Sequence, residues 1–198
     1  MTEGPSPSAV PVAGLLLAAG AGRRMGSPKA LLAGPDGLSY AARGIRVLRE
    51  AGCRPVIVVL GASAAEAAAA TTEADRVVVA HEWRSGQSAS LRAGLEAAAQ
   101  SDAEAVVVLL VDLPDVGADV VRRVAQSAVG APAGLARAAY LGVPGHPVLL
   151  GREHWQGVLA AAEGDSGARD YLARHPHELV ECADLATGRD VDTPADLA

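Results

Sequence analysis

The chain has 198 residues, half of them apolar, and a formal net charge of −6. This length fits one domain with a substantial core and leaves little room for two. The acidic balance argues against a nucleic-acid-binding protein, which normally presents a basic face. Only 3% of the residues are aromatic and Phe is absent, so Val, Leu, Ile and Ala must build the core, as suits a parallel sheet covered by helices.

The cysteines and the start of the chain indicate where the protein works. Cys53 and Cys182 lie far apart and match no metal-binding spacing, which favours free thiols in a reducing cytoplasm. Residues 1–11 are polar and Pro-rich without the apolar stretch of a signal peptide, and we expect a disordered tail there. The longest apolar run, 105–111, is too short to span a membrane. We therefore expect a cytoplasmic protein without membrane contact, whose single domain covers 12–198.

Short apolar runs alternate with helix-like stretches in the first part of this domain. The expected strands are 12–18, 55–60, 76–80 and 105–111, and the expected helices lie near 39–51, 63–72 and 88–99. Strands that are apolar on both faces and alternate with helices indicate a doubly wound α/β sheet.

The pattern changes in the last third of the chain. Residues 134–150 read as two extended segments interrupted by glycine and proline, which predicts an antiparallel addition to the sheet. The further expected elements are helices near 152–162 and 167–174, a strand at 178–182, and a last helical turn with Thr193 as N-cap and Pro194 as first residue. The predicted fold class is one three-layer α/β/α domain with a mostly parallel, doubly wound sheet.

A Gly-rich segment follows the first predicted strand and contains the only lysine of the chain, Lys29. Backbone amides of such a turn can approach phosphates closely, and its cations can neutralise them, which favours a nucleoside triphosphate. A Rossmann loop would need Gly or Ala at Met25, and a Walker A loop would need lysine directly after Gly26, so both assignments fail. The alternative is a plain Gly-rich turn with surface arginines.

A carboxylate, Asp112, stands where the strand 105–111 ends. Open α/β sheets bind ligands at this edge, and carboxylate oxygens suit Mg²⁺, which bridges phosphates. The alternative is that Asp112, before Leu113 and Pro114, only caps the next element.

Several short motifs, in order and over nearly the whole domain, resemble the molybdenum-cofactor nucleotidyltransferase family. They are LAAGAGRRMGSPK at 17–29, GQSASLRAGL at 86–95, DLP at 112–114, GHP at 145–147, GDSGAR at 164–169 and DVDTP at 190–194. The Leu-Ala-Ala-Gly start resembles the cytidylyltransferases, because the guanylyltransferases more often read Leu-Ala-Gly-Gly. Leu113 departs from the cytidylyltransferase pattern, which often has Gln there, so the nucleotide and acceptor stay open.

The resemblance implies transfer of CMP from CTP to the molybdopterin cofactor, with Mg²⁺ as cofactor and pyrophosphate as product. It also implies a transient contact with a molybdenum hydroxylase. Arg24, Lys29 and Asp112 are the expected catalytic residues, and Asp112 and Asp192 the expected metal ligands. The residues expected to bind the nucleotide are Leu17, Ala18, Ala19, Gly20, Gly22, Gly26, Lys29, Gln87, Ser88 and Ser90. His146 and Arg169 are candidates to contact the acceptor. The alternatives are a structural histidine, a solvent-facing arginine, and Ser88 as a helix N-cap.

Three other functions remain to be weighed. The nearest is a transferase of the same fold that uses GTP or acts on a different phosphorylated metabolite. A second is a non-catalytic nucleotide-binding module in cofactor maturation, which would not need both aspartates. A third, an NAD-dependent oxidoreductase, is disfavoured by Met25 in the Gly-rich segment.

Overall fold

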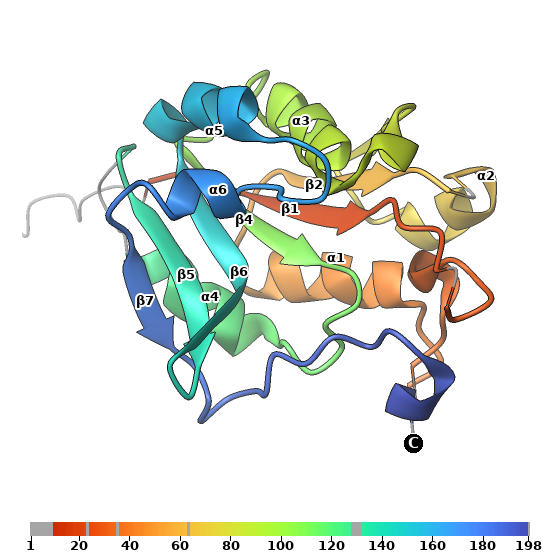
Figure 1. Cartoon of the computed structure of the whole chain (residues 1–198). Coiled ribbons are helices and arrows are strands. Elements are labelled where there is room, and N and C mark those ends of the chain that lie inside the picture. Colours follow the sequence, from red (N-terminus) through yellow and green to blue (C-terminus); the bar gives the residue numbers. More distant parts are fainter. Residues whose placement is uncertain (1–9, 23, 35, 63, 128–131, 198) are drawn as a thin grey trace, which may run out of the picture.

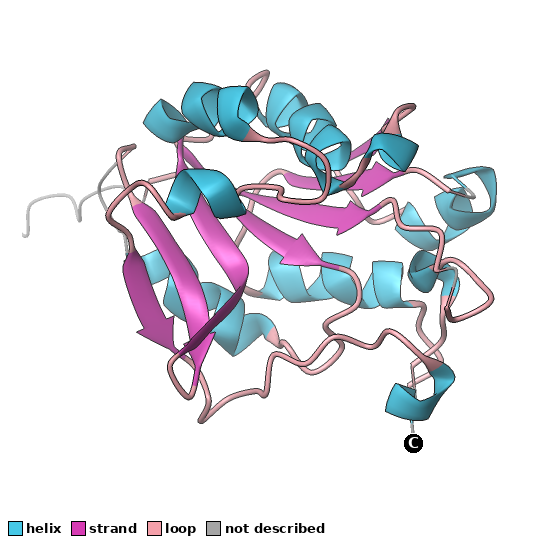
Figure 2. Cartoon of the chain, viewed as in Figure 1, coloured by secondary structure: helices cyan, strands magenta, loops and turns pink. Residues whose placement is uncertain are grey.

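A seven-stranded sheet forms the centre of the computed structural model, which describes residues 10–197 except 23, 35, 63 and 128–131 (Figures 1 and 2). The strands are β1 Val12–Ala18, β2 Val56–Leu60, β3 Arg76–Val79, β4 Ala105–Leu110, β5 Leu135–Tyr140, β6 Val143–Gly151 and β7 Glu178–Glu181. Their order across the sheet is β3-β2-β1-β4-β6-β5-β7.

Strand directions confirm the predicted mixed sheet. β1 pairs parallel with both β2 and β4, and β2 pairs parallel with β3. β6 runs antiparallel to both β4 and β5, while β7 runs parallel to β5. The antiparallel addition is therefore the β5–β6 hairpin, inserted between β4 and β7.

Two helical layers cover the sheet (Figure 1). The helices are α1 Tyr40–Glu50, α2 Ala64–Ala67, α3 Gln87–Ala98, α4 Ala118–Ser127, α5 Trp155–Ala161 and α6 Arg169–Leu172. Short 3₁₀ turns lie at Lys29–Leu31, Ala68–Thr71, Trp83–Ser85, Arg152–His154 and Pro194–Leu197. The predicted helices near 63–72 and 152–162 are each split between an α-helix and a 3₁₀ turn.

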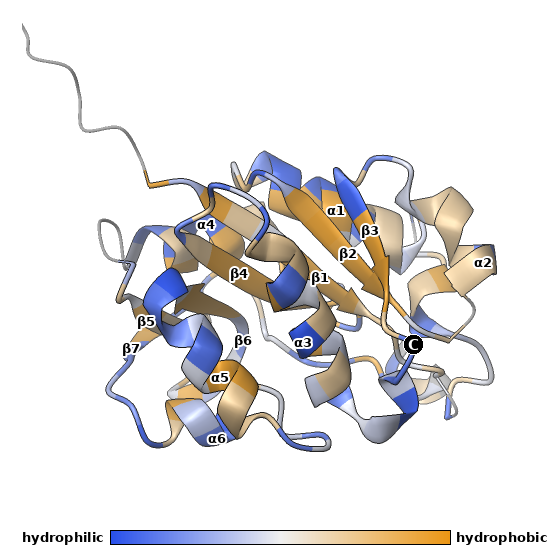
Figure 3. Ribbon diagram, turned by 90° about the horizontal axis from the view of Figure 1, so that it is seen from above, coloured by the Kyte–Doolittle hydropathy of each residue, from blue (hydrophilic) through white to orange (hydrophobic). Residues whose placement is uncertain are grey.

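The alternation of side chains along each strand explains why helices lie on both faces. In β1, Leu16 belongs to the apolar cluster under α1 and α4, whereas Leu15 and Leu17 belong to the cluster under α3, α5 and α6. Both faces of the central strands are therefore apolar, and β1, β2 and β4 have the colour of hydrophobic residues along the ribbon in Figure 3. The sequence pattern gave no element for 118–127, and α4 there completes the first layer.

The first and last described segments of the chain both contact the rest of the domain. Residues 1–9 of the predicted tail 1–11 lie outside the described residues, whereas Pro11 is held by its carbonyl, which accepts a hydrogen bond from the Glu104 amide at 2.9 Å. After β7, the chain runs back beneath the sheet toward the Gly-rich segment (Figure 1). In the described part of the chain, no helix is long and apolar enough to cross a membrane.

Candidate active site

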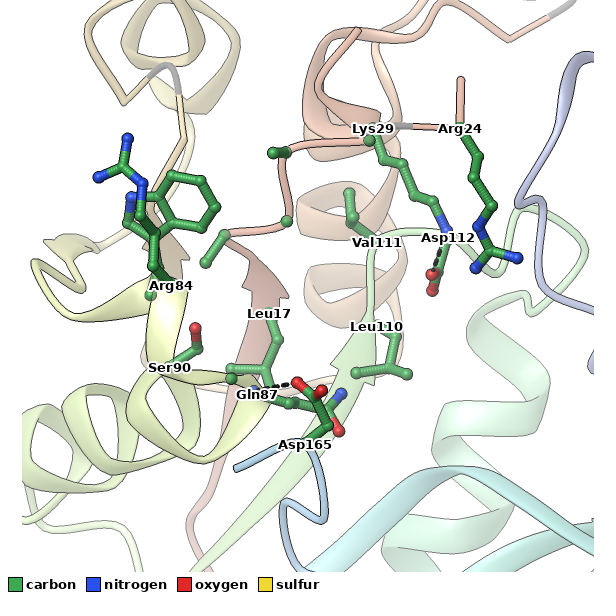
Figure 4. A pocket seen from close by; sticks show the side chains of 16 residues that line it. Leu17, Arg24, Lys29, Arg84, Gln87, Ser90, Leu110, Val111, Asp112 and Asp165 are labelled. Carbon is green, nitrogen blue, oxygen red and sulfur yellow. Dashed lines mark hydrogen bonds and ion pairs between the residues drawn. The ribbon is translucent and has the colours of Figure 1, made fainter. Parts of the chain in front are cut away.

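A pocket of about 500 Å³ lies at the carboxyl ends of β1 and β4 (Figure 4). From β1 the chain continues outward to β2 and then β3, whereas β4 lies on the opposite side of β1, so the strand order reverses between β1 and β4. Such a switch point is where open α/β sheets bind ligands. The residues that line the pocket are Leu17, Ala19, Gly20, Ala21, Gly22, Arg24, Lys29, Trp83, Arg84, Gly86, Gln87, Ser90, Leu110, Val111, Asp112 and Asp165.

The Gly-rich turn between β1 and Lys29 takes its shape from Gly22. This residue has φ +57°, and a Cβ placed on it would lie 1.9 Å from the carbonyl oxygen of Ser27. The Gly22 carbonyl accepts a hydrogen bond from the Met25 amide at 2.9 Å, which closes a tight turn. A side chain at position 22 would therefore open this turn and displace Lys29.

The ammonium of Lys29 lies between two carboxylates. Its Nζ donates to Asp112 Oδ2 at 2.8 Å and also to Asp192 Oδ1. Arg24 donates from one guanidinium nitrogen to Asp192 Oδ2 at 2.6 Å. The structure thus brings together the predicted catalytic residues Arg24, Lys29 and Asp112 with the predicted metal ligand Asp192.

This arrangement shifts two ionisation equilibria. Burial lowers the pKa of Lys29, but the hydrogen bonds and charges of Asp112 and Asp192 outweigh it and raise the pKa above its ordinary value. The hydrogen bond from Lys29 is the main cause that lowers the pKa of Asp192, and the charges of Lys29 and Arg24 add to it. Lys29 and Asp192 are therefore both charged at neutral pH and form an ion pair beside the pocket.

The segment that follows β7 brings Asp192 next to Lys29 and Asp112. The Val191 amide donates to the carbonyl of Asp112 at 2.9 Å, which fixes the next residue beside the Asp112 side chain. Asp196 then accepts from the amides of Asp192 and Thr193, and from the Thr193 hydroxyl at 2.8 Å. Asp112 and Asp192 are thus brought together by a long-range backbone contact that no local sequence pattern encodes.

The other end of the pocket is formed by the start of α3 and a distant loop. Asp165 Oδ1 accepts from the Gln87 amide at 3.2 Å, and the Gly164 carbonyl accepts from the Ser88 amide at 3.0 Å. Gly86 permits this contact, because it has φ +119° and a Cβ there would lie 2.3 Å from the Gly164 backbone. In Figure 4, Gln87, Ser90 and Asp165 lie away from Lys29 and Asp112.

Most predicted nucleotide-binding residues line the pocket, and three do not. Ala18 and Gly26 are absent from the residues that line it. The Ser88 hydroxyl is buried and accepts from the Gly167 amide at 3.3 Å. The prediction of Ser88 as the N-cap is wrong, because α3 begins at Gln87 and Gly86 holds the cap position, with Ser88 inside the first turn.

The candidate acceptor residues lie outside the pocket lining. His146 is on β6, and Arg169 is the exposed first residue of α6. The His146 carbonyl accepts from the Tyr140 hydroxyl at 2.7 Å, so the backbone of His146 has a structural role.

Trp83, Arg84 and Asp165 line the pocket without having been predicted as site residues. The Arg84 guanidinium lies 4.6 Å from the centre of the Trp83 ring, so the pair forms one flat wall. Trp83 also lies against Gly61 after β2, where an added Cβ would be 2.7 Å from the ring. The available signal was a tryptophan three residues before the Gly86–Gln87 motif, since the chain has only two tryptophans.

An open α/β sheet with a cationic Gly-rich turn and two carboxylates at its switch point defines a nucleotidyltransferase-type enzyme. Residues 14–179 match the family described as MobA-like NTP transferase domain. The chain therefore belongs to this family, which confirms the predicted fold class and enzyme class.

Individual relatives carry different names. The chain is 38% identical over 193 residues to "Nicotine blue oxidoreductase" of Paenarthrobacter nicotinovorans, covering 92% of each protein. It is 40% identical over 114 residues to a "Probable molybdenum cofactor guanylyltransferase" of Opitutus terrae, covering 57% of this chain and 54% of the relative.

A solved structure from Mycobacterium tuberculosis H37Rv, Rv0371c, is 32% identical and covers 96% of each chain with a TM-score of 0.77. A second structure of Rv0371c, in complex with manganese, is 31% identical with a TM-score of 0.72, covering 94% of this chain and 96% of that one. The likeness extends over nearly the whole of both chains.

Proposed function

We propose that the protein transfers CMP from CTP to a phosphorylated acceptor, the molybdopterin cofactor, and releases pyrophosphate. The observation that carries this proposal is the placement of Lys29 and Arg24 beside two carboxylates at the open edge of β1 and β4. A nucleoside triphosphate needs cations for its phosphates and oxygen ligands for its divalent ion, and this edge offers both.

Arg24 and Lys29 would hold the triphosphate and neutralise the charge that develops on the leaving pyrophosphate. Both side chains extend from the Gly-rich turn and already contact carboxylates, so each can exchange an aspartate oxygen for a phosphate oxygen. A phosphomonoester acceptor is mostly dianionic at neutral pH, because its second pKa is about 6. It therefore attacks the α-phosphate without a general base, and positioning and charge provide the catalysis.

Asp112 and Asp192 fit a divalent cation. Asp112 Oδ1 is buried and has no hydrogen-bond partner among the described residues, so it is an oxygen that still needs a ligand. Carboxylate oxygens are the donors that Mg²⁺ prefers, and when bound the ion would neutralise phosphate charge. Members of the family generally use divalent ions, and Mg²⁺ is the one proposed here.

Ser90 and the Trp83–Arg84 wall are proposed to receive the base and ribose. Ser90 is 4% exposed yet lines the pocket, so α3 fixes the position of this residue at the pocket wall. The Asp165 carboxylate at the same end would accept a hydrogen bond from an exocyclic amino group. Cytosine and guanine both carry such a group, so this feature disfavours uracil without separating CTP from GTP.

Calorimetric titration with CTP, GTP, UTP and ATP, followed by pyrophosphate release with molybdopterin, tests the assignment. CTP should bind at least about tenfold more tightly than UTP, and Asp165→Ala should remove most of that preference, since an unpaired polar group costs about 1–3 kcal/mol. Tighter binding and faster turnover with GTP would instead establish the guanylyltransferase alternative. The non-catalytic module would be supported by a different result: the protein binds nucleotide, and Asp112→Ala supports cofactor maturation as well as the wild type does.

A second candidate is a redox reaction, because the relative of matching length is named an oxidoreductase. The pocket would then hold a nicotinamide dinucleotide in place of a triphosphate, although Met25 departs from the usual dinucleotide loop. Titration with NADH and NADPH separates the two functions. Dinucleotide binding at micromolar concentration, with CTP and GTP both inert, would replace the transferase proposal with the redox one.

A further inference from the structure

Two arginines and a histidine gather on one face of the sheet, beside the end of the pocket that holds Asp165. Arg137 lies on β5, His146 on β6, and Arg169 begins α6 four residues after Asp165. β5 and β6 are paired with Arg137 opposite Val148, and the Nε of Arg137 donates to the Gly145 carbonyl at 3.3 Å. Arg137 is thus tied to the residue directly before His146.

The register of β6 against β4 places this cluster near the pocket. The last paired positions are Val108 of β4 and Val148 of β6. Leu110, two residues beyond Val108, lines the pocket, and His146 lies two residues beyond Val148 in the same direction along the sheet. The imidazole is therefore at the carboxyl end of β4, close to where Asp112 follows.

The positive charges of the cluster act on one another. Burial, and then the charges of Arg137 and Arg169, lower the pKa of His146 to about 4. Burial, and then the charge of Arg169, also lower the pKa of Arg137. Because these charges have the same sign, they repel one another, and a bound anion would relieve that repulsion.

No described carboxylate compensates the two guanidinium groups. Among the residues for which the structure gives ion pairs, neither Arg137 nor Arg169 is paired with an aspartate or glutamate. Two other partly buried arginines do have such partners, Arg49 with Asp75 and Arg123 with Asp184, whereas Arg152 donates to three backbone carbonyls. Arg137 has a single described bond, to a carbonyl, so its guanidinium retains donors for a ligand that would supply the missing charge.

We propose that Arg137, His146 and Arg169 form the binding site for the phosphomonoester dianion of the acceptor. This inference rests on the proposed nucleotidyl transfer and adds Arg137, whose role no sequence motif indicated. The two guanidinium groups bind the phosphate oxygens as charge-assisted donors, and the neutral imidazole adds a third donor. The site would hold the nucleophilic phosphate beside Leu110 and align it with the nucleotide in the pocket.

NMR of the His146 imidazole tests this site directly. The pocket is first filled with the non-hydrolysable analogue α,β-methylene CTP, and inorganic phosphate is then titrated at constant ionic strength, with the His146 signal assigned from His146→Gln. Phosphate should raise the pKa of His146 by about one unit, because a bound phosphate anion favours the imidazolium. Arg137→Gln and Arg169→Gln should each raise the half-saturating phosphate concentration about tenfold, while the exposed Arg174→Gln leaves it unchanged.

Two results overturn the inference: a His146 signal that does not respond to phosphate, or a response that is the same in both arginine variants as in the wild type. If Arg137→Gln does not fold, Arg169→Gln and Arg137→Lys decide the question, because Arg169 is exposed. Binding of the CTP analogue is measured in the same samples. Its failure would contradict the proposed function, and the phosphate titration of the free protein would then judge the anion site separately.

Discussion

Replacing Lys29 by glutamine should destabilise the nucleotide-free protein substantially. The ammonium is the shared partner of Asp112 and Asp192, and without it two negative charges face each other at a partly buried edge. The side chains are only 13% exposed for Lys29, 20% for Asp112 and 27% for Asp192, so solvent screens the interaction incompletely.

The magnitude follows from the two charge-assisted hydrogen bonds that are lost. Each contributes about 1.5–3 kcal/mol when partly buried, and partial exposure reduces the sum to about 2–4 kcal/mol. Arg24 provides a matched control, because it contacts the same Asp192 carboxylate while its side chain is 71% exposed. Arg24→Gln should therefore cost less than about 1 kcal/mol.

Urea unfolding at pH 7 in the presence of EDTA, with both variants measured beside the wild type, gives these values. Addition of Mg²⁺ should restore part of the stability of Lys29→Gln, since the cation then compensates Asp112 and Asp192. Equal midpoints for Lys29→Gln and wild type would refute the reasoning. So would a loss in Arg24→Gln as large as that in Lys29→Gln.

Three more outcomes are expected. In urea unfolding, Gly22→Ala should lower the free energy of unfolding by about 2 kcal/mol or more, whereas Gly26→Ala should lower it by only about 1 kcal/mol. Both glycines have a positive φ, but only at Gly22 would the added Cβ also clash with the backbone. Equal losses in the two variants would contradict this account of the turn. The lowered pKa of Asp192 gives stability that is full above the ordinary aspartate pKa and is lost as pH falls through the lowered value. The advantage of wild type over Asp192→Asn in unfolding free energy should therefore shrink between about pH 5 and pH 2, and a constant difference would exclude the ion pair. Burial raises the pKa of Cys53 to about 11, so a thiol reagent at pH 8 should label it only as fast as the protein unfolds; rapid labelling of the native state would show that it is not buried.

The sheet could be predicted because apolar periodicity is a local property. β1, β2 and β4 are continuous apolar runs, and each was expected within a residue of its observed bounds. The helix α4 was missed although its buried valines, Val120, Val121 and Val124, follow a helical spacing. Valine is typical of strands as well as buried helices, so this short stretch gave a mixed signal.

The site could be predicted only as far as its motifs reach. The Gly-rich turn and Asp112 each follow a strand, so their meeting at one edge follows from parallel pairing. Asp192 depends on the return of the chain after β7, and Asp165 depends on a loop that packs against α3. Arg137 lies within a strand and belongs to no motif, so only the packed structure shows its charge beside His146.

The most direct test of the central claim is pyrophosphate release from CTP in the presence of Mg²⁺ and molybdopterin, compared between wild type and Asp112→Asn. Wild type should release one pyrophosphate for each cytosine dinucleotide formed. Asp112→Asn should lose at least about a hundredfold in rate while its CTP affinity changes by less than about tenfold, because the lost carboxylate acts mainly in the transition state. Asp112→Asn with wild-type turnover, or a wild type that releases no pyrophosphate from CTP or GTP, would contradict the account.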